Sequence, residues 1–432
     1  MTQPDYTPTG VTRPLAATLS PSRTVLDNGV SVIVRETHKT AAATISLAMR
    51  SGSACDPPHR AGAMYLLSRL LDRGTGRHSA DELAESLESR GVSLATTVSR
   101  HQVSMTCTCL SGDFAHVLAA LAEMIVEPAI PEAELVTRRA EVLTAIAQDR
   151  DSPYVTALEE LLGLLYGVDH PYGRPAKGTP ETVARLTREE LLGLHHVRFA
   201  PSELCLVVVG EVDRDRVTDE AARAFGAWRA LHPAPVPLAH PDRILARRRK
   251  VVPMPGKAQA DIAYGFTAIA RSDPDYYASW LMNNVFGQYA IGGRLCDSIR
   301  ERQGMAYYVS SSLDAGLVEG PLVIRAGVSP ANVGRTIESI DNEVRRMRTE
   351  GVTEQELAES RQYLLGSMPR TLETNAGIAA FLQNAEFFGL GLDYDARLPQ
   401  LLGAVARDEV NAAARRLLDP DRATITVAEP SS

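Results

Sequence analysis

The chain has 432 residues, about three times the length of a common single domain, so two or more hydrophobic cores are expected. A hydrophobic fraction of 44% with 23% charged residues is typical of globular proteins and excludes a disordered or fibrous class. The net charge of -8 is mild, and basic residues are scattered except at Arg247, Arg248, Arg249 and Lys250, which argues against a nucleic-acid partner.

The N-terminal stretch, residues 1–22, is rich in Thr, Pro and Ser and has neither a basic start nor an apolar centre. It does not have the form of a signal peptide, and we expect a disordered arm. No other stretch has about 18 consecutive apolar residues, so no membrane span is expected. The five cysteines are dispersed and odd in number, which favours a reducing compartment. These features predict a cytoplasmic protein that binds neither nucleic acid nor membrane.

The first half begins with a predicted hairpin over residues 24–35, because Asp27-Asn28-Gly29 is turn chemistry between apolar stretches. After it the pattern predicts a strand at 42–49, helices at 62–71 and 80–90, strands within 94–110, and helices at 114–125 and 131–148. Strands and helices thus come in separate runs. This order predicts an α+β fold in which helices cover one face of a mostly antiparallel sheet.

The second half repeats the first. Residues 183–191 lead through a helix into an apolar strand at 201–209, and residues 405–410 lead in the same way into 420–427. A second echo pairs residues 130–135 with 352–357, and each opens a long helix. The sequence therefore predicts two homologous domains.

A proline-rich stretch separates the two halves and indicates an extended linker. The predicted organisation is a disordered arm at 1–22, an N-terminal domain at 23–230, a linker at 231–242 and a C-terminal domain at 243–432.

Several motifs after Arg23 resemble the M16 zinc peptidases, the pitrilysin family that includes insulinase and mitochondrial processing peptidase. In chain order they are Leu26-Asp27-Asn28-Gly29-Val30, Asp169-His170-Pro171-Tyr172-Gly173-Arg174-Pro175, Gly178-Thr179-Pro180-Glu181, Pro255-Gly256-Lys257-Ala258-Gln259-Ala260, Gly293-Arg294-Leu295, Gly304-Met305-Ala306-Tyr307 and Gly351-Val352-Thr353-Glu354. The resemblance implies two domains of the LuxS/MPP-like metallohydrolase fold.

The family's zinc motif is His-x-x-Glu-His on the first helix, and a distant glutamate completes the ligand set. Here the resemblance places the two histidine positions at Tyr65 and Arg69, the general-base position at Ser68, and the third ligand near Ala145. None of these side chains performs the family role, and a guanidinium at Arg69 repels a dication. We therefore expect no metal and no other cofactor in this chain.

The family also uses an arginine and a tyrosine, seven residues apart, that reach the bound peptide from the second half. Arg300 and Tyr307 match that spacing. A cationic fork and a phenol suit the stabilisation of a substrate carbonyl and an oxyanion. The alternative is structural, with Arg300 in surface ion pairs and Tyr307 in the core.

The resemblance therefore implies the non-catalytic subunit of a heterodimeric zinc peptidase. Such a subunit forms a closed peptide chamber together with its partner, which carries zinc, and supplies Arg300 and Tyr307 to the partner's site. The main alternative is a catalytically inactive peptide-binding or scaffold protein of the same fold.

Overall fold

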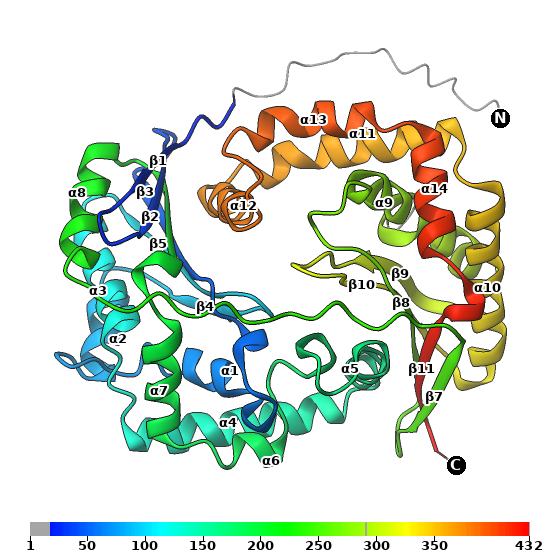
Figure 1. Cartoon of the computed structure of the whole chain (residues 1–432), viewed down its shortest axis with the longest axis horizontal. Helices are drawn as coiled ribbons and strands as arrows, with labels where there is room; N and C mark the ends of the chain where they lie inside the picture. Colours follow the sequence, from blue (N-terminus) through cyan, green and yellow to red (C-terminus); the bar gives the residue numbers. More distant parts are fainter. Residues whose placement is uncertain (1–17, 290–291, 432) are drawn as a thin grey trace.

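The computed structural model describes residues 18–289 and 292–431 and consists of two halves, each built around one sheet (Figure 1). The strands of the first sheet lie in the order β1-β2-β6-β3-β5-β4. Its strands are β1 (Ser22–Val25), β2 (Ser31–Glu36), β3 (Ala42–Met49), β4 (Ala95–Val98), β5 (Val103–Leu110) and β6 (Leu204–Gly210). All neighbours are antiparallel except β2 and β6, which confirms the predicted mostly antiparallel sheet.

The second sheet has the order β7-β11-β8-β10-β9, and only β7 and β11 are parallel. Its strands are β7 (Arg248–Pro253), β8 (Ala260–Thr267), β9 (Ala306–Leu313), β10 (Pro321–Val328) and β11 (Thr424–Glu429). Apart from the extra β1, the two sheets share one strand order and one pattern of directions, which confirms the predicted duplication.

The helices of the first half are α1 (Ala63–Ser68), α2 (Ala80–Glu88), α3 (Phe114–Val126), α4 (Glu132–Arg150), α5 (Pro153–Tyr166), α6 (Pro180–Val183), α7 (Arg188–Arg198) and α8 (Arg214–Phe225). Those of the second half are α9 (Tyr276–Asn283), α10 (Val333–Glu350), α11 (Glu354–Thr371), α12 (Asn375–Phe387), α13 (Tyr394–Ala404) and α14 (Arg407–Leu417). Both pairs of repeated segments lead into helices, as predicted: α7 and α14 in one pair, α4 and α11 in the other. Side chains of Thr187 and Thr353 cap α7 and α11, and a glutamate three residues later completes each capping box.

Most helices of each half cover one face of their own sheet, as the sequence predicts. In the first half, Val32, Ile45 and Val208 of the sheet share one core with residues of α1, α3 and α7. The opposite face of each sheet is also covered, which the sequence analysis did not anticipate. Helix α5 of the first half packs on β8 and β11, and α12 of the second half packs on β3 and β6 (Figure 1). The halves therefore exchange one helix each.

Two predicted boundaries need correction. Residues 1–17 lie outside the described part of the chain, but Leu19 is buried and its N–H donates to Asp395 Oδ2 at 2.7 Å. Ser22 already belongs to β1, so residues 18–22 are not a disordered arm. The predicted linker 231–242 lies inside a longer irregular segment, residues 226–247, which separates α8 from β7.

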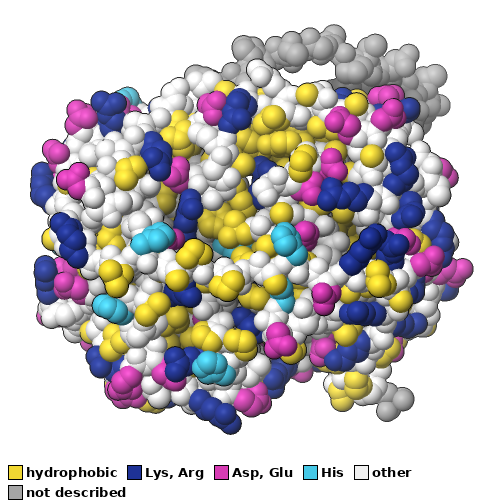
Figure 2. Space-filling model, viewed as in Figure 1, with side chains coloured by type: hydrophobic (Ala, Val, Ile, Leu, Met, Phe, Trp, Pro, Cys, Tyr) yellow, Lys and Arg dark blue, Asp and Glu magenta, His cyan; other side chains and the backbone are white. Residues whose placement is uncertain are grey.

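On the face seen in Figure 2, basic and acidic side chains are interspersed, and no large area carries one sign of charge. Apolar side chains gather toward the middle of this face, between the two halves. Among the described residues, no helix is both long and apolar enough to cross a membrane.

Candidate functional site

Helix α1 carries the predicted zinc positions, and a buried carboxylate fixes where it begins. Asp56 accepts hydrogen bonds from the N–H groups of Gly62 and Met64, both at 2.9 Å. Gly62 has a φ of +91°, a conformation that favours glycine, and a Cβ there would lie 2.4 Å from the carbonyl oxygen of Lys177. The start of α1 thus has little freedom to move.

Burial raises the pKa of the Asp56 carboxyl to about 7, although the N–H groups of Met64 and Gly62 and the charge of Arg174 act in the opposite direction. Arg174 also donates to the Asp56 carbonyl oxygen at 2.8 Å. Asp56 is a residue of this site that the sequence did not predict. The available signal was a carboxylate six residues before a glycine that opens a helix.

The family motif at residues 169–175 and the residues after it contact the segment that leads into α1. Arg174 belongs to this motif, and Thr182, directly after the next motif at 178–181, donates its hydroxyl to the carbonyl oxygen of Ala61 at 2.7 Å. His170 accepts from the Tyr172 N–H through Nδ1 and bonds the Ala239 carbonyl through Nε2, both at 3.0 Å. His170 therefore has a structural role, holding its own loop and the segment at Ala239 together.

The predicted zinc positions lie on two helices that contact each other, α1 and α4. Tyr65 is half-buried, Ser68 is buried and donates to the Tyr65 carbonyl oxygen at 2.7 Å, and Arg69 is exposed at the end of α1. Ala145 is half-buried on α4. At the four predicted positions, these two contacting helices carry a phenol, a hydroxyl, a guanidinium and a methyl group.

This set of side chains does not fit zinc, which takes thiolate, imidazole or carboxylate ligands. Within residues 18–289 and 292–431, no group of three or more His, Cys, Asp or Glu side chains is arranged to hold a metal ion. His195 is buried, with Nε2 2.8 Å from the Ile125 carbonyl oxygen. It is a core residue because α7 packs this ring near the end of α3.

Arg300 and Tyr307 lie on adjoining elements of the second half. Arg300 is in the helical segment Cys296–Arg302, and Tyr307 is in β9. The chain reverses between them at Gly304, whose φ is +60°, and the Gly304 N–H donates to the Arg300 carbonyl at 3.0 Å. Tyr307 is 67% exposed, so it does not fill the core. The Arg300 side chain is 48% exposed, and its ion pair with Glu301 is long, at 3.8 Å.

The segment that carries Arg300 is anchored by two other family motifs. Arg294 is buried, and it binds Glu356 through two hydrogen bonds at 2.6 and 2.7 Å and the Gly351 carbonyl at 2.7 Å. Although burial alone would raise it, the hydrogen bonds from Arg294 and Thr353 lower the pKa of Glu356 to about 2. The glycine-rich loop 287–293 lies directly before this anchor. Gly287 approaches the backbone of Ser311 closely, whereas Ala290 and Ile291 lie outside the described residues.

Strand β4 is the edge of the first sheet and lies beside α1. Among the described strands it pairs only with β5. An extended peptide can hydrogen-bond to such an edge through its backbone with little demand on sequence.

Comparison with known proteins supports the same family. The family model described as "Insulinase (Peptidase family M16)" matches residues 31–173, and the model described as "Peptidase M16 inactive domain" matches residues 185–364. Together the two models match well over half of the chain.

Full-length relatives align along most of this chain. An uncharacterized zinc protease of Streptomyces coelicolor is 26% identical over 405 residues, which cover 92% of this chain and 87% of the relative. An uncharacterized zinc protease of Bacillus subtilis is also 26% identical, with 93% and 96% covered.

Solved structures show the same fold. The M16 inactive domain from Pseudomonas fluorescens is 23% identical, covers 96% of this chain and 98% of its own, and has a TM-score of 0.88. A protease from Helicobacter pylori is 17% identical, covers 96% of this chain and 100% of its own, and has a TM-score of 0.89. The chain belongs to the M16 peptidase family.

Proposed function

We propose that this chain is the non-catalytic subunit of a heterodimeric M16 zinc metallopeptidase. In this proposal a second M16 chain, with an intact zinc motif, binds the metal. The present chain closes the peptide chamber and supplies Arg300 and Tyr307 to the partner's site. The substrate class is peptides, precursor or leader peptides among them.

One contrast carries the proposal. The first half has lost every side chain with which the family binds zinc and activates water, whereas the second half keeps the arginine and tyrosine at the family spacing. Both of the retained side chains are exposed. An exposed guanidinium and an exposed phenol contribute little to the fold, but both are available to a partner subunit.

The chemistry of the two retained side chains suits transition-state stabilisation. When bound in the partner, zinc supplies a polarised carbonyl and an activated water. The Arg300 guanidinium would orient a substrate carbonyl through two N–H donors, because a guanidinium presents its donors as a rigid fork. The Tyr307 hydroxyl would donate to the oxygen on which negative charge develops. Closure of the chamber around the peptide would exclude water and strengthen both interactions.

The test mixes this chain with the zinc-motif M16 protein encoded nearest to it in its genome and follows a quenched peptide library in the presence of zinc. We expect cleavage by the mixture and none by this chain alone. Arg300→Gln and Tyr307→Phe should each lower the mixture's kcat at least tenfold, since each removes a donor to developing charge. Arg302→Gln is a matched control, because Arg302 is exposed on the same segment and already paired with Asp297.

Assembly is measured beside activity by size-exclusion chromatography. A variant that assembles but does not cleave locates the defect in the chemistry, whereas one that does not assemble shows only an interface role. Cleavage by this chain alone would refute the non-catalytic assignment.

A second function, an inactive peptide-binding or scaffold protein, is favoured by the open edge of β4 beside α1. It requires only backbone pairing at that edge. Binding of a fluorescent peptide to this chain alone, unchanged by Arg300→Gln and Tyr307→Phe and without cleavage in the mixture, would favour this function.

A further inference from the structure

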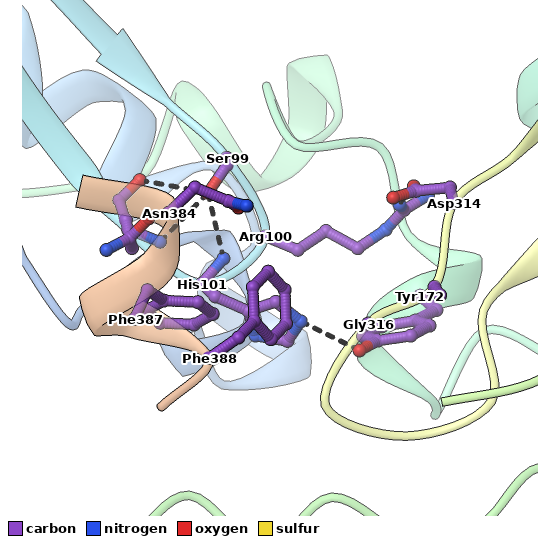
Figure 3. Close-up of a pocket in the computed structure, with 11 residues that line it drawn as sticks. Ser99, Arg100, His101, Tyr172, Asp314, Gly316, Asn384, Phe387 and Phe388 are labelled. Carbon is purple, nitrogen blue, oxygen red and sulfur yellow. Dashed lines mark hydrogen bonds and ion pairs between the residues drawn. The ribbon is translucent and has the colours of Figure 1, made fainter. Parts of the chain in front are cut away.

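A cavity of about 360 Å³ lies where the turns of two equivalent hairpins meet, one from each half (Figure 3). Residues 99–102 join β4 to β5, and residues 314–320 join β9 to β10. The end of α12 and Tyr172 complete the wall. The cavity is thus built from both halves and is separate from Arg300, Tyr307 and the former zinc positions.

Two opposite charges lie in this wall. Arg100 contributes a guanidinium from the first half, and Asp314 a carboxylate from the second, 2.6 Å apart. The Arg100 side chain is only 24% exposed, and its guanidinium carbon lies 5.1 Å from the centre of the Tyr172 ring. Asp314 is 61% exposed. A pair with one solvated partner contributes little to stability, so a ligand can separate the two charges at small cost.

The apolar part of the wall is largely aromatic and lies beside a few polar side chains. Phe387 and Phe388 at the end of α12 are packed edge to face, with ring centres 4.8 Å apart, and the His101 ring stacks on Phe387 at 6.0 Å. His101 Nε2 is 2.7 Å from the Tyr172 hydroxyl. Burial, and then the charge of Arg100, lower the pKa of His101 to about 4, so the ring is neutral at neutral pH. The wall therefore carries one positive charge, one negative charge and a patch of aromatic rings.

We propose that this cavity binds a free aromatic amino acid as its zwitterion. The carboxylate of the ligand pairs with Arg100, its ammonium with Asp314, and its ring packs against Phe387 and Phe388. A zwitterion replaces one ion pair by two without adding net charge, which a ligand with a single charge does not do. The volume lies near the lower end of the range for small-molecule sites, and an aromatic ring provides most of the apolar area that such a site buries.

Isothermal titration calorimetry on the full chain tests the site, with L-phenylalanine as the probe. Phenethylamine lacks the carboxylate, phenylacetate lacks the ammonium, and phenylalanine amide imitates the N-terminus of a peptide. We expect L-phenylalanine to bind at least about tenfold more tightly than each of the three. Asp314→Asn should weaken L-phenylalanine binding by a similar factor, because it removes the charge but keeps the shape.

Asp393→Asn is the matched control. Asp393 is a similarly exposed carboxylate, 66% exposed and paired with Arg397, and its neutralisation should leave the affinity unchanged. Three outcomes would overturn the proposal: no heat with L-phenylalanine up to about 10 mM, equal binding by phenylalanine amide, or full affinity in Asp314→Asn.

Discussion

The exchange of helices between the halves makes a sharp prediction at the contact between Leu161 and Gly265. Leu161 lies on α5 of the first half and is fully buried, and Gly265 lies on β8 of the second half. A Cβ built on Gly265 would lie 2.8 Å from Leu161 Cδ2 and 3.2 Å from the Leu322 carbonyl oxygen. The leucine side chain therefore occupies the space that the glycine leaves open.

Each single substitution should destabilise the chain for a different reason. Leu161→Ala removes buried methyl groups and leaves a cavity, which costs about 2–5 kcal/mol of unfolding free energy. Gly265→Ala forces the new methyl group against Leu161 and costs about 1–3 kcal/mol. In the double variant the new methyl group fills part of the cavity, so the combined loss should be smaller than the sum by at least about 1 kcal/mol.

Urea denaturation followed by circular dichroism gives the four unfolding free energies, and Leu245→Ala, at an exposed position of the irregular segment 226–247, serves as a control with little change. Because the two residues belong to different halves, their coupling reports directly on the exchanged helix. Additivity within about 0.5 kcal/mol would refute the contact. Two separate unfolding transitions would refute the wider inference that the halves depend on each other.

Three further predictions concern the site. The pKa of Asp56 is about 7 in the folded chain and lower in the unfolded chain, so its contribution to stability is present in acid and lost as the pH rises toward 7. Asp56→Asn should remove this pH dependence from unfolding free energies measured across that range. Arg294→Leu should cost about 3 kcal/mol, seen as a lower urea midpoint, because it leaves the Glu356 carboxylate without its main partner. Restoring the family ligands with Tyr65→His, Ser68→Glu, Arg69→His and Ala145→Glu should create zinc binding in competition with a chelating dye, and a variant that folds without binding zinc would show that the positions were assigned wrongly.

Much of the fold could be predicted because the duplicated halves share turn chemistry and helix caps. The repeated segments at 130–135 and 352–357 lead into α4 and α11, and the predicted hairpin at 24–35 forms between β1 and β2. These are local signals, decided by a few neighbouring residues. They locate elements well but do not say which sheet an amphipathic helix joins.

The helix exchange depends on a longer-range choice. Helix α5 has one apolar stripe, and its sequence does not determine which of the two sheets covers that stripe. The usable signal lay in the strands. Every residue of β6 is buried, and its unbroken apolar run is typical of a strand covered on both faces, which requires a helix beyond those of its own face.

The family motifs were recognised from the sequence, but their physical roles became visible only in contacts. Arg174 donates to the backbone carbonyl of Asp56, whose carboxylate fixes the start of α1, and Arg294 ties the segment of Arg300 to the start of α11. Both contacts join residues far apart in the chain. A motif indicates that such a contact exists, whereas its partner, here Asp56 or Glu356, is set by the fold.

Arg300 and Tyr307 differ from the other predicted site residues because the fold makes little use of their side chains. The Ser68 hydroxyl donates a hydrogen bond within its own helix, and Tyr65 is half-buried against the core of the first half. Tyr307 is mostly exposed and Arg300 has only a long, solvated ion pair. Truncating either should therefore change the unfolding free energy by no more than about 0.5 kcal/mol. If Arg300→Gln and Tyr307→Phe leave stability and assembly intact but abolish cleavage by the mixture, the loss must arise at the partner's active site; a loss of stability would instead make them structural residues.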